Sequence, residues 1–102
     1  MRQPIRRPGS MIKTAAQDIG AQALLFLVED EGRLYRFLGD TGLDPSDLRR
    51  QAGTDTTLAA VLGHLLDDES LLLVFTASAG IEPLDVQAAR KALGGASPWD
   101  SV

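Results

Sequence analysis

Hydrophobic residues recur along this chain at helical spacing, and polar residues, glycines and prolines separate them into six short segments. Apolar residues at i, i+3, i+4 and i+7 mark one face of an α-helix, whereas strict alternation, which marks a strand, is absent. The pattern predicts an all-α fold, a compact bundle of about six short helices. These helices are expected at about residues 14–29, 31–41, 45–52 and 58–66, around residues 71–75, and at residues 83–93.

The second half of the chain repeats the first at an offset of 38 residues. When residues 21–47 are aligned with residues 59–85, ten of the 27 pairs are identical, and turn residues align with turn residues. A supersecondary unit that is used twice produces a self-match of this kind. The sequence therefore predicts that the bundle is built from two similar three-helix units.

Glycines and acidic triplets mark the expected helix ends. Gly42 and Gly80 follow the second and fifth predicted helices, where a residue in the left-handed conformation commonly ends a helix. The triplets at residues 29–31 and 67–69 precede predicted helices, and carboxylates at that position accept hydrogen bonds from free backbone N–H groups. They lack the spacing of a calcium-binding loop, so we expect them to cap helices.

Two segments, residues 24–28 and 71–75, are apolar at five consecutive positions. Five consecutive residues cover the whole circumference of a helix, so we expect protein to surround both segments. A small bundle buries one face of a helix more easily than all of them, and leftover apolar area favours an isologous dimer. Central burial within one chain and a homodimer therefore both stay open.

Composition agrees with one soluble domain. The chain has 102 residues, of which 44% are hydrophobic and 24% are charged, and it has no cysteine. This composition suits a cytoplasmic protein without disulfides, and no stretch approaches the roughly 20 apolar residues that a membrane span needs. We expect a single helical domain over residues 14–95, followed by a C-terminal tail at residues 96–102.

The charge is unevenly distributed along the chain. Residues 1–13 contain four basic and no acidic side chains, whereas residues 14–102 contain six basic and fourteen acidic ones. The first segment also contains prolines and a glycine and has no apolar periodicity, which predicts a disordered basic N-terminal arm. Met1 and Met11 both stay open as the first residue of the natural chain.

No motif in the sequence points to catalysis, a cofactor or a metal. His64 is the only histidine, and it aligns with Phe26 of the first half, so we expect it at the flank of the core. A nucleophile needs a positioned base, and no serine-centred motif accompanies His64. The glycines stand mostly at helix ends, and no phosphate-binding loop is present. We therefore expect a protein that is not an enzyme and that has no catalytic, cofactor-binding or metal-binding residues.

Elimination favours a protein-protein interaction or homo-oligomeric module, whose partner is an unidentified protein or a second copy of the chain. Arg33, Tyr35 and Arg36 are the possible interface residues, because tyrosine and arginine are favoured at interfaces. The alternative is a nucleic-acid-associated protein that uses a helix-turn-helix-like pair around Gly42 or Gly80 and the basic arm. The acidic body opposes binding to phosphates, which makes nucleic acid the less favoured partner.

Residues from about Ala21 to Gly95 resemble the domain-of-unknown-function family 3572, a family of short bacterial proteins. The resemblance rests on the two G-[LI]-[DE]-P-x-D-[LV] turns, at residues 42–48 and 80–86, and on the repeated acidic triplets. It implies a small helical bacterial protein of the cytosol. It implies no activity and no ligand.

Overall fold

The computed structural model describes residues 11–94, and this part of the chain forms six α-helices and no strand, which confirms the all-α prediction. Residues 1–10, which hold most of the predicted arm, and the predicted tail at residues 96–102 lie outside the described residues. The helices are α1 Lys13–Val28, α2 Glu31–Thr41, α3 Pro45–Gln51, α4 Asp55–Leu66, α5 Glu69–Ala79 and α6 Pro83–Ala92.

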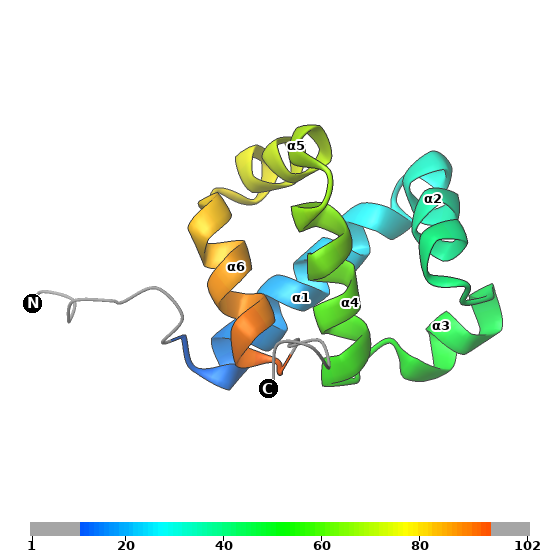
Figure 1. Cartoon of the computed structure of the whole chain (residues 1–102), viewed down its shortest axis with the longest axis horizontal. Helices are drawn as coiled ribbons and strands as arrows, with labels where there is room; N and C mark the ends of the chain where they lie inside the picture. Colours follow the sequence, from blue (N-terminus) through cyan, green and yellow to red (C-terminus); the bar gives the residue numbers. More distant parts are fainter. Residues whose placement is uncertain (1–10, 95–102) are drawn as a thin grey trace, which may run out of the picture.

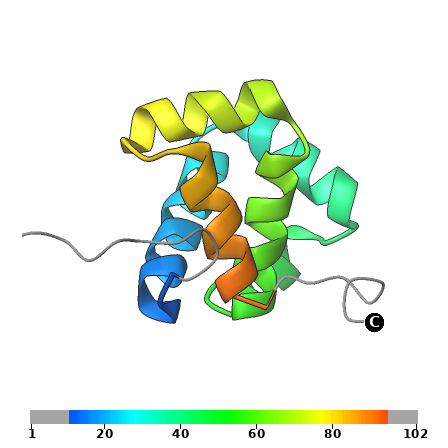
Figure 2. The same cartoon turned by 60° about the vertical axis from the view of Figure 1, so that its left-hand side comes forward.

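Helices α1 and α4 cross at the centre of the molecule, with α2 and α3 on one side and α5 and α6 on the other (Figure 1). Helix α6 packs against both central helices, and α5 continues from the end of α4 across the top of the bundle (Figure 2). The α1, α4 and α6 helices therefore form the centre of the fold, and α2 and α5 close it from two sides.

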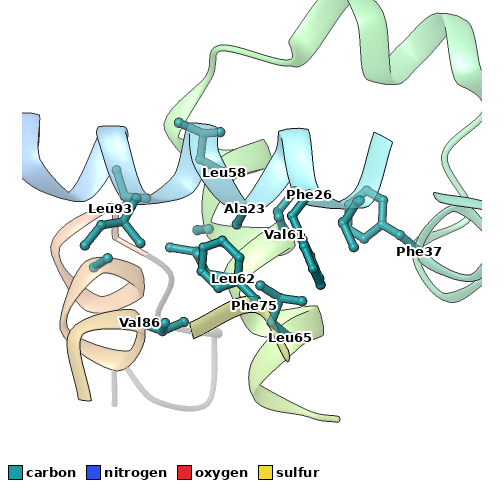
Figure 3. Close-up of a cluster of buried hydrophobic side chains, with 14 of the residues drawn as sticks. Ala23, Phe26, Phe37, Leu58, Val61, Leu62, Leu65, Phe75, Val86 and Leu93 are labelled. Carbon is teal, nitrogen blue, oxygen red and sulfur yellow. The ribbon is translucent and has the colours of Figure 1, made fainter. Parts of the chain in front are cut away.

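The core lies between these helices and is built around two aromatic contacts. Phe26 and Phe75 have ring centroids 5.3 Å apart, and Phe37 and His64 are separated by the same distance. Leu62 of α4 is fully buried beside the first pair (Figure 3). At the offset of 38 residues, Phe26 is equivalent to His64, and Phe37 is equivalent to Phe75. Each ring pair therefore joins the same two positions of the repeat, with one ring from each half of the chain.

The crossing of α1 and α4 also joins equivalent positions. The side-chain amide of Gln17 donates a hydrogen bond to Asp55 Oδ1 over 2.9 Å, and these residues are 38 positions apart. One turn further on, a Cβ atom added to Gly20 would lie only 2.9 Å from Cβ of Leu58, again at an offset of 38. Glycine at this position therefore permits the two helices to approach closely.

The third helices of the two halves pack differently. Helix α6 lies against α1 and α4, whereas α3 makes no extensive contact with either. The buried residues of the α6 segment are Val86, Ala88, Ala89 and Leu93, and the equivalent residues of the first half are Leu48, Arg50, Gln51 and Asp55. Only one of these equivalents is apolar, so α3 cannot insert as α6 does. The prediction of two similar three-helix units is therefore not confirmed.

The acidic triplets act as helix caps, as predicted. The Asp30 side chain accepts a hydrogen bond from the backbone N–H of Arg33 over 3.1 Å, and the Asp68 side chain accepts one from Leu71 over 3.2 Å. Helix α4 begins at Asp55, earlier than the residue 58 predicted from the apolar pattern. Its N-cap is Thr54. The first turn of α4 is polar, so the spacing of apolar residues does not show that the helix begins before Leu58.

The prediction that protein surrounds both apolar runs is wrong for the single chain. Leu25 and Val28 of α1 are 58% and 49% exposed, and Leu73 and Val74 of α5 are 48% and 50% exposed. Each helix buries one side in the core, and no other helix of residues 11–94 covers its outer side. Considerable apolar area therefore faces solvent in the monomer.

The left-handed glycines generate a test of the helix ends. Gly42 and Gly80 have φ values of 76° and 72°, as predicted for the residues that end α2 and α5. A β-branched residue resists positive φ, so we expect Gly42→Val or Gly80→Val to lower the free energy of unfolding by about 1–2 kcal/mol in urea melts. Gly39→Ala is the control, because Gly39 is helical and has open space for a Cβ atom. This change should stabilise the protein by up to about 1 kcal/mol, and unaltered melts of both valine variants would contradict the assignment.

Two carboxylates generate a test of pH dependence. The Ser46 hydroxyl and then the backbone N–H of Asp47 lower the pKa of Asp44 from its usual 3.8, and Gln17 and then Lys13 lower the pKa of Asp55. A lowered pKa in the folded state adds stability that is present above the unfolded pKa and is lost as the pH falls through the folded pKa.

We therefore expect the wild-type free energy of unfolding to fall as the pH is lowered below about 4. The double variant Asp44→Asn/Asp55→Asn should show a smaller loss, because asparagine does not titrate and at position 44 it can still cap α3. Urea melts at a series of pH values measure both proteins. Parallel losses in the two proteins would show that these carboxylates do not carry the effect.

Candidate functional site

A shallow groove of about 170 Å³ lies between α1 and α5. Helix α1 contributes Gln22, Leu25, Phe26 and Glu29, and helix α5 contributes Phe75, Ser78 and Ala79. The two phenylalanine side chains are almost completely buried, so they present only the edge of the core to the groove. The groove therefore has an apolar floor and a partly polar rim.

Half-exposed apolar side chains continue the groove on both sides. Val28 is three residues after Leu25 on α1, and Val74 is four residues before Ser78 on α5. Residues three and four apart are neighbours on the surface of a helix. Leu25, Val28, Val74 and the groove thus form one continuous region, which we call the α1–α5 surface.

The stripe of α1 that borders the groove carries a carboxylate at each end, of which Glu29 lines the groove itself. Asp18, Gln22, Leu25 and Glu29 stand at i, i+4, i+7 and i+11, which is a single stripe along one face of the helix. After Lys13, whose ammonium group lies 3.0 Å from Asp55, α1 contains no basic residue, and α5 contains none at all. The helices that form the groove therefore offer carboxylates without compensating lysine or arginine.

Sequence analysis did not find this surface because it predicted that residues 24–28 are buried on all sides. The three polar residues on the same stripe as Leu25 indicate that this side of α1 faces solvent. A core stripe of a helix is apolar along its length, whereas Leu25 is the only apolar member of its stripe. Reading each apolar residue together with its neighbours at helical spacing identifies Leu25 as a surface residue.

The three predicted interface residues take different positions on α2. The guanidinium carbon of Arg33 lies 3.9 Å from the centroid of the Phe26 ring, and its NH1 group donates a hydrogen bond to the carbonyl oxygen of Phe26 over 3.1 Å. Tyr35 is 62% exposed, and Arg36 is also exposed. Arg33 therefore adjoins a residue that lines the groove, while Tyr35 and Arg36 face solvent.

His64 occupies the seam between α2 and α4, next to the core. Its side chain is only 7% exposed, its Nδ1 atom lies 3.2 Å from Asp40 Oδ2, and its Nε2 atom is buried without a hydrogen-bond partner. Through the repeat, Phe37, Asp40 and His64 correspond to Phe75, Ser78 and Phe26 of the groove. The seam between α2 and α4 and the groove between α1 and α5 therefore occupy equivalent positions of the repeat. Among the described residues, a polar side-chain contact joins the two helices only at the first of these, between His64 and Asp40.

The helices that resemble a helix-turn-helix pair have few basic groups to offer. Arg50 of α3 pairs with Asp47, and the guanidinium group of Arg90 on α6 lies against Gly63 of α4. Helix α6 is packed between α1 and α4, and the carboxylate of Asp85 in its first turn accepts a hydrogen bond from the backbone N–H of Glu82. Neither helix therefore displays a basic face at its N-terminal end.

The described residues, 11–94, contain neither a metal-binding cluster nor a single helix that could span a membrane. No group of three histidine, aspartate or glutamate side chains in this part of the chain could hold a metal ion. No single helix within it is long and apolar enough to cross a membrane. Helices α5 and α6 together have a suitable length and composition, but they meet at a bend of 97°.

The contacts of Arg33 generate a test that separates the predicted interface residues. Arg33→Ala removes a cation–π contact and a hydrogen bond to the end of α1, so we expect it to lower the free energy of unfolding by about 1–2 kcal/mol. Arg36→Ala is the matched control and should change stability by less than about 0.5 kcal/mol, because Arg36 is exposed. Urea melts measure both variants, and equal effects would contradict the structural role of Arg33.

Comparisons with known proteins identify a family and no activity. No curated protein and no solved structure gives a significant match to this chain. A family model described as "Protein of unknown function (DUF3572)" matches residues 13–96, which include all six helices and begin earlier than the resemblance seen at residue 21. The chain therefore belongs to the DUF3572 family.

Proposed function

We propose that this protein is a non-enzymatic protein-interaction module and that the α1–α5 surface is its binding surface. The main support for this proposal is that Leu25 is 58% exposed at the edge of a groove whose floor is formed by Phe26 and Phe75. Contiguous exposed apolar area of this kind is unfavourable in water unless another molecule covers it. A partner that fills the groove would remove this area from solvent.

The size of the groove favours a protein over a small molecule. Pockets for drug-sized ligands usually have volumes of about 300–1,000 Å³ and enclose most of the ligand. This groove has about 170 Å³ and is open to solvent, which suits one or two apolar side chains projecting from a larger partner. Side chains seated in this way are typical anchors of protein interfaces.

The predicted interface residues extend the proposal onto α2. Arg33 lies against Phe26 and connects α2 with the groove, and Arg36, three residues later, is its neighbour on the helix surface. Tyr35 points to a different side of α2, because two residues correspond to about 200° of rotation. Arg36 is therefore proposed as a rim contact, and Tyr35 belongs to the interface only if the partner also covers the outer side of α2.

A capture experiment with matched leucine variants tests the proposal. Tagged wild-type protein, Leu25→Ser and Leu84→Ser are used to recover partners from a nuclease-treated extract of the source cells, and mass spectrometry identifies the bound proteins. Leu84 is 55% exposed on α6 and does not line the groove, so it is the control for loss of an exposed leucine. We expect one stoichiometric partner with wild type and Leu84→Ser.

The affinity of that partner for Leu25→Ser should be at least about tenfold weaker, as expected for an interface anchor. Light scattering of the purified proteins measures self-association, which is also expected to depend on Leu25 if the partner is a second copy. Equal recovery with Leu25→Ser and wild type, together with an unchanged oligomeric state, would contradict the proposed surface.

A further inference from the structure

We infer that the groove of the α1–α5 surface receives an amphipathic helix of a partner protein, whose apolar face is flanked by lysine or arginine. This inference rests on the proposed function, because it names the chemistry of the partner that binds the same surface. Two features of the described residues support it. One is the charge around the groove, and the other is the packing at the equivalent position of the second half.

The charge of the groove selects a basic partner. Glu29 lines the groove, and Asp18 stands at the other end of the same α1 stripe, 11 residues away. At about 1.5 Å per residue, the two carboxylates are separated by roughly 16 Å along the helix. The Arg33 guanidinium group is held against the Phe26 ring and does not line the groove, and no other lysine or arginine of the described residues lines it. Basic groups spaced along a partner helix would meet both carboxylates.

The other half of the fold already places a helix at the equivalent position. Leu25 corresponds to Gly63 of α4, and α6 packs along α4 with the Arg90 guanidinium group against Gly63. A Cβ atom on Gly63 would lie 3.2 Å from Nε of Arg90. Helix α3, the equivalent of α6, does not pack extensively against α1, so no helix of residues 11–94 takes the corresponding place beside Leu25. A helix therefore flanks position 63 in the second half, and the glycine there leaves room for its arginine side chain.

A second copy of the chain is a poorer occupant on electrostatic grounds. Residues 11–94 contain seven basic and thirteen acidic side chains, and the groove of a second copy would bring its own carboxylates. Like charges placed opposite each other in an interface oppose association. Helix α5 has no basic residue with which to compensate them. The charge pattern thus favours a partner of opposite sign over self-association.

Two synthetic peptides test the inference directly. Both are amphipathic helices of about 14 residues with leucines at i, i+3, i+4 and i+7, and they differ only in having lysine or glutamate at the remaining positions. Each is titrated into the isotope-labelled full-length protein, and NMR measures the chemical shifts of the backbone amides. A scrambled leucine-lysine peptide, which has the same charge and no apolar face, reports non-specific attraction.

We expect the leucine-lysine peptide to shift the amides of Leu25, Glu29, Ser78 and Ala79, and to bind at least about tenfold more tightly than the other two peptides. Raising the salt concentration from about 0.05 to about 0.5 M should weaken this binding, because it screens exposed charges. Glu29→Lys should abolish the preference for lysine over glutamate, and Leu84→Ser should leave it unchanged. This set of results would support the inference.

Other outcomes overturn it and separate it from the proposed function. Equal binding of the lysine and glutamate peptides, or shifts that avoid the groove, would refute a basic amphipathic partner. If the protein self-associates through Leu25, or if deletion of residues 1–10 shifts the groove amides, the groove is covered by a second copy or by the arm, and only the present inference fails. If no peptide binds and Leu25→Ser also recovers the same proteins from the extract as wild type, with an unchanged oligomeric state, the proposed function fails as well.

Discussion

The close crossing of α1 and α4 determines where every other helix can pack. Gly20 has no side chain to keep Leu58 at a distance, and the hydrogen bond between Gln17 and Asp55 fixes the two helices one turn away from this contact. Because the central pair approaches so closely, α6 can reach both helices at once, and its small residues Ala88 and Ala89 allow that approach. Close packing of this kind removes apolar surface from water and gives the bundle one shared core.

The same geometry accounts for the exposed surface. One side of the central pair is covered by α6, whereas the equivalent helix α3 ends in polar residues and contributes only Leu48 to the core. Phenylalanines from α2 and α5 close the ends of the core, but they do not reach the outer side of α1. A domain of this size lacks the helices to surround all of its apolar residues, so Leu25 and Val28 remain in contact with solvent.

The helices and their ends depend on local interactions and could be predicted from the sequence, whereas the packing between helices was less predictable. Gly42, Gly80, Asp30 and Asp68 each act through hydrogen bonds or dihedral preferences of their own neighbourhood, so their roles follow from the sequence. How α3 and α6 pack depends on contacts between distant helices, and the alignment of residues 21–47 with residues 59–85 stopped short of the difference between Gln51 and Ala89. The groove was missed for a related reason, because five consecutive apolar residues carry no periodicity to distinguish a buried from an exposed side.

A comparison of the two seams explains how similar halves of one chain acquire different surfaces. At one seam, His64 is buried against Phe37 and lies beside Asp40, so polar groups from α2 and α4 meet across it. At the other seam the equivalent residues are Phe26 and Ser78, and neither offers a charged group to bridge α1 and α5. The adjacent positions of the repeat also differ. Gly63 leaves room for the Arg90 side chain, whereas its equivalent, Leu25, projects into solvent. Three positions of the repeat, Gly63/Leu25, His64/Phe26 and Asp40/Ser78, thus distinguish a seam bridged by side chains of the fold from an apolar groove with a partly polar rim.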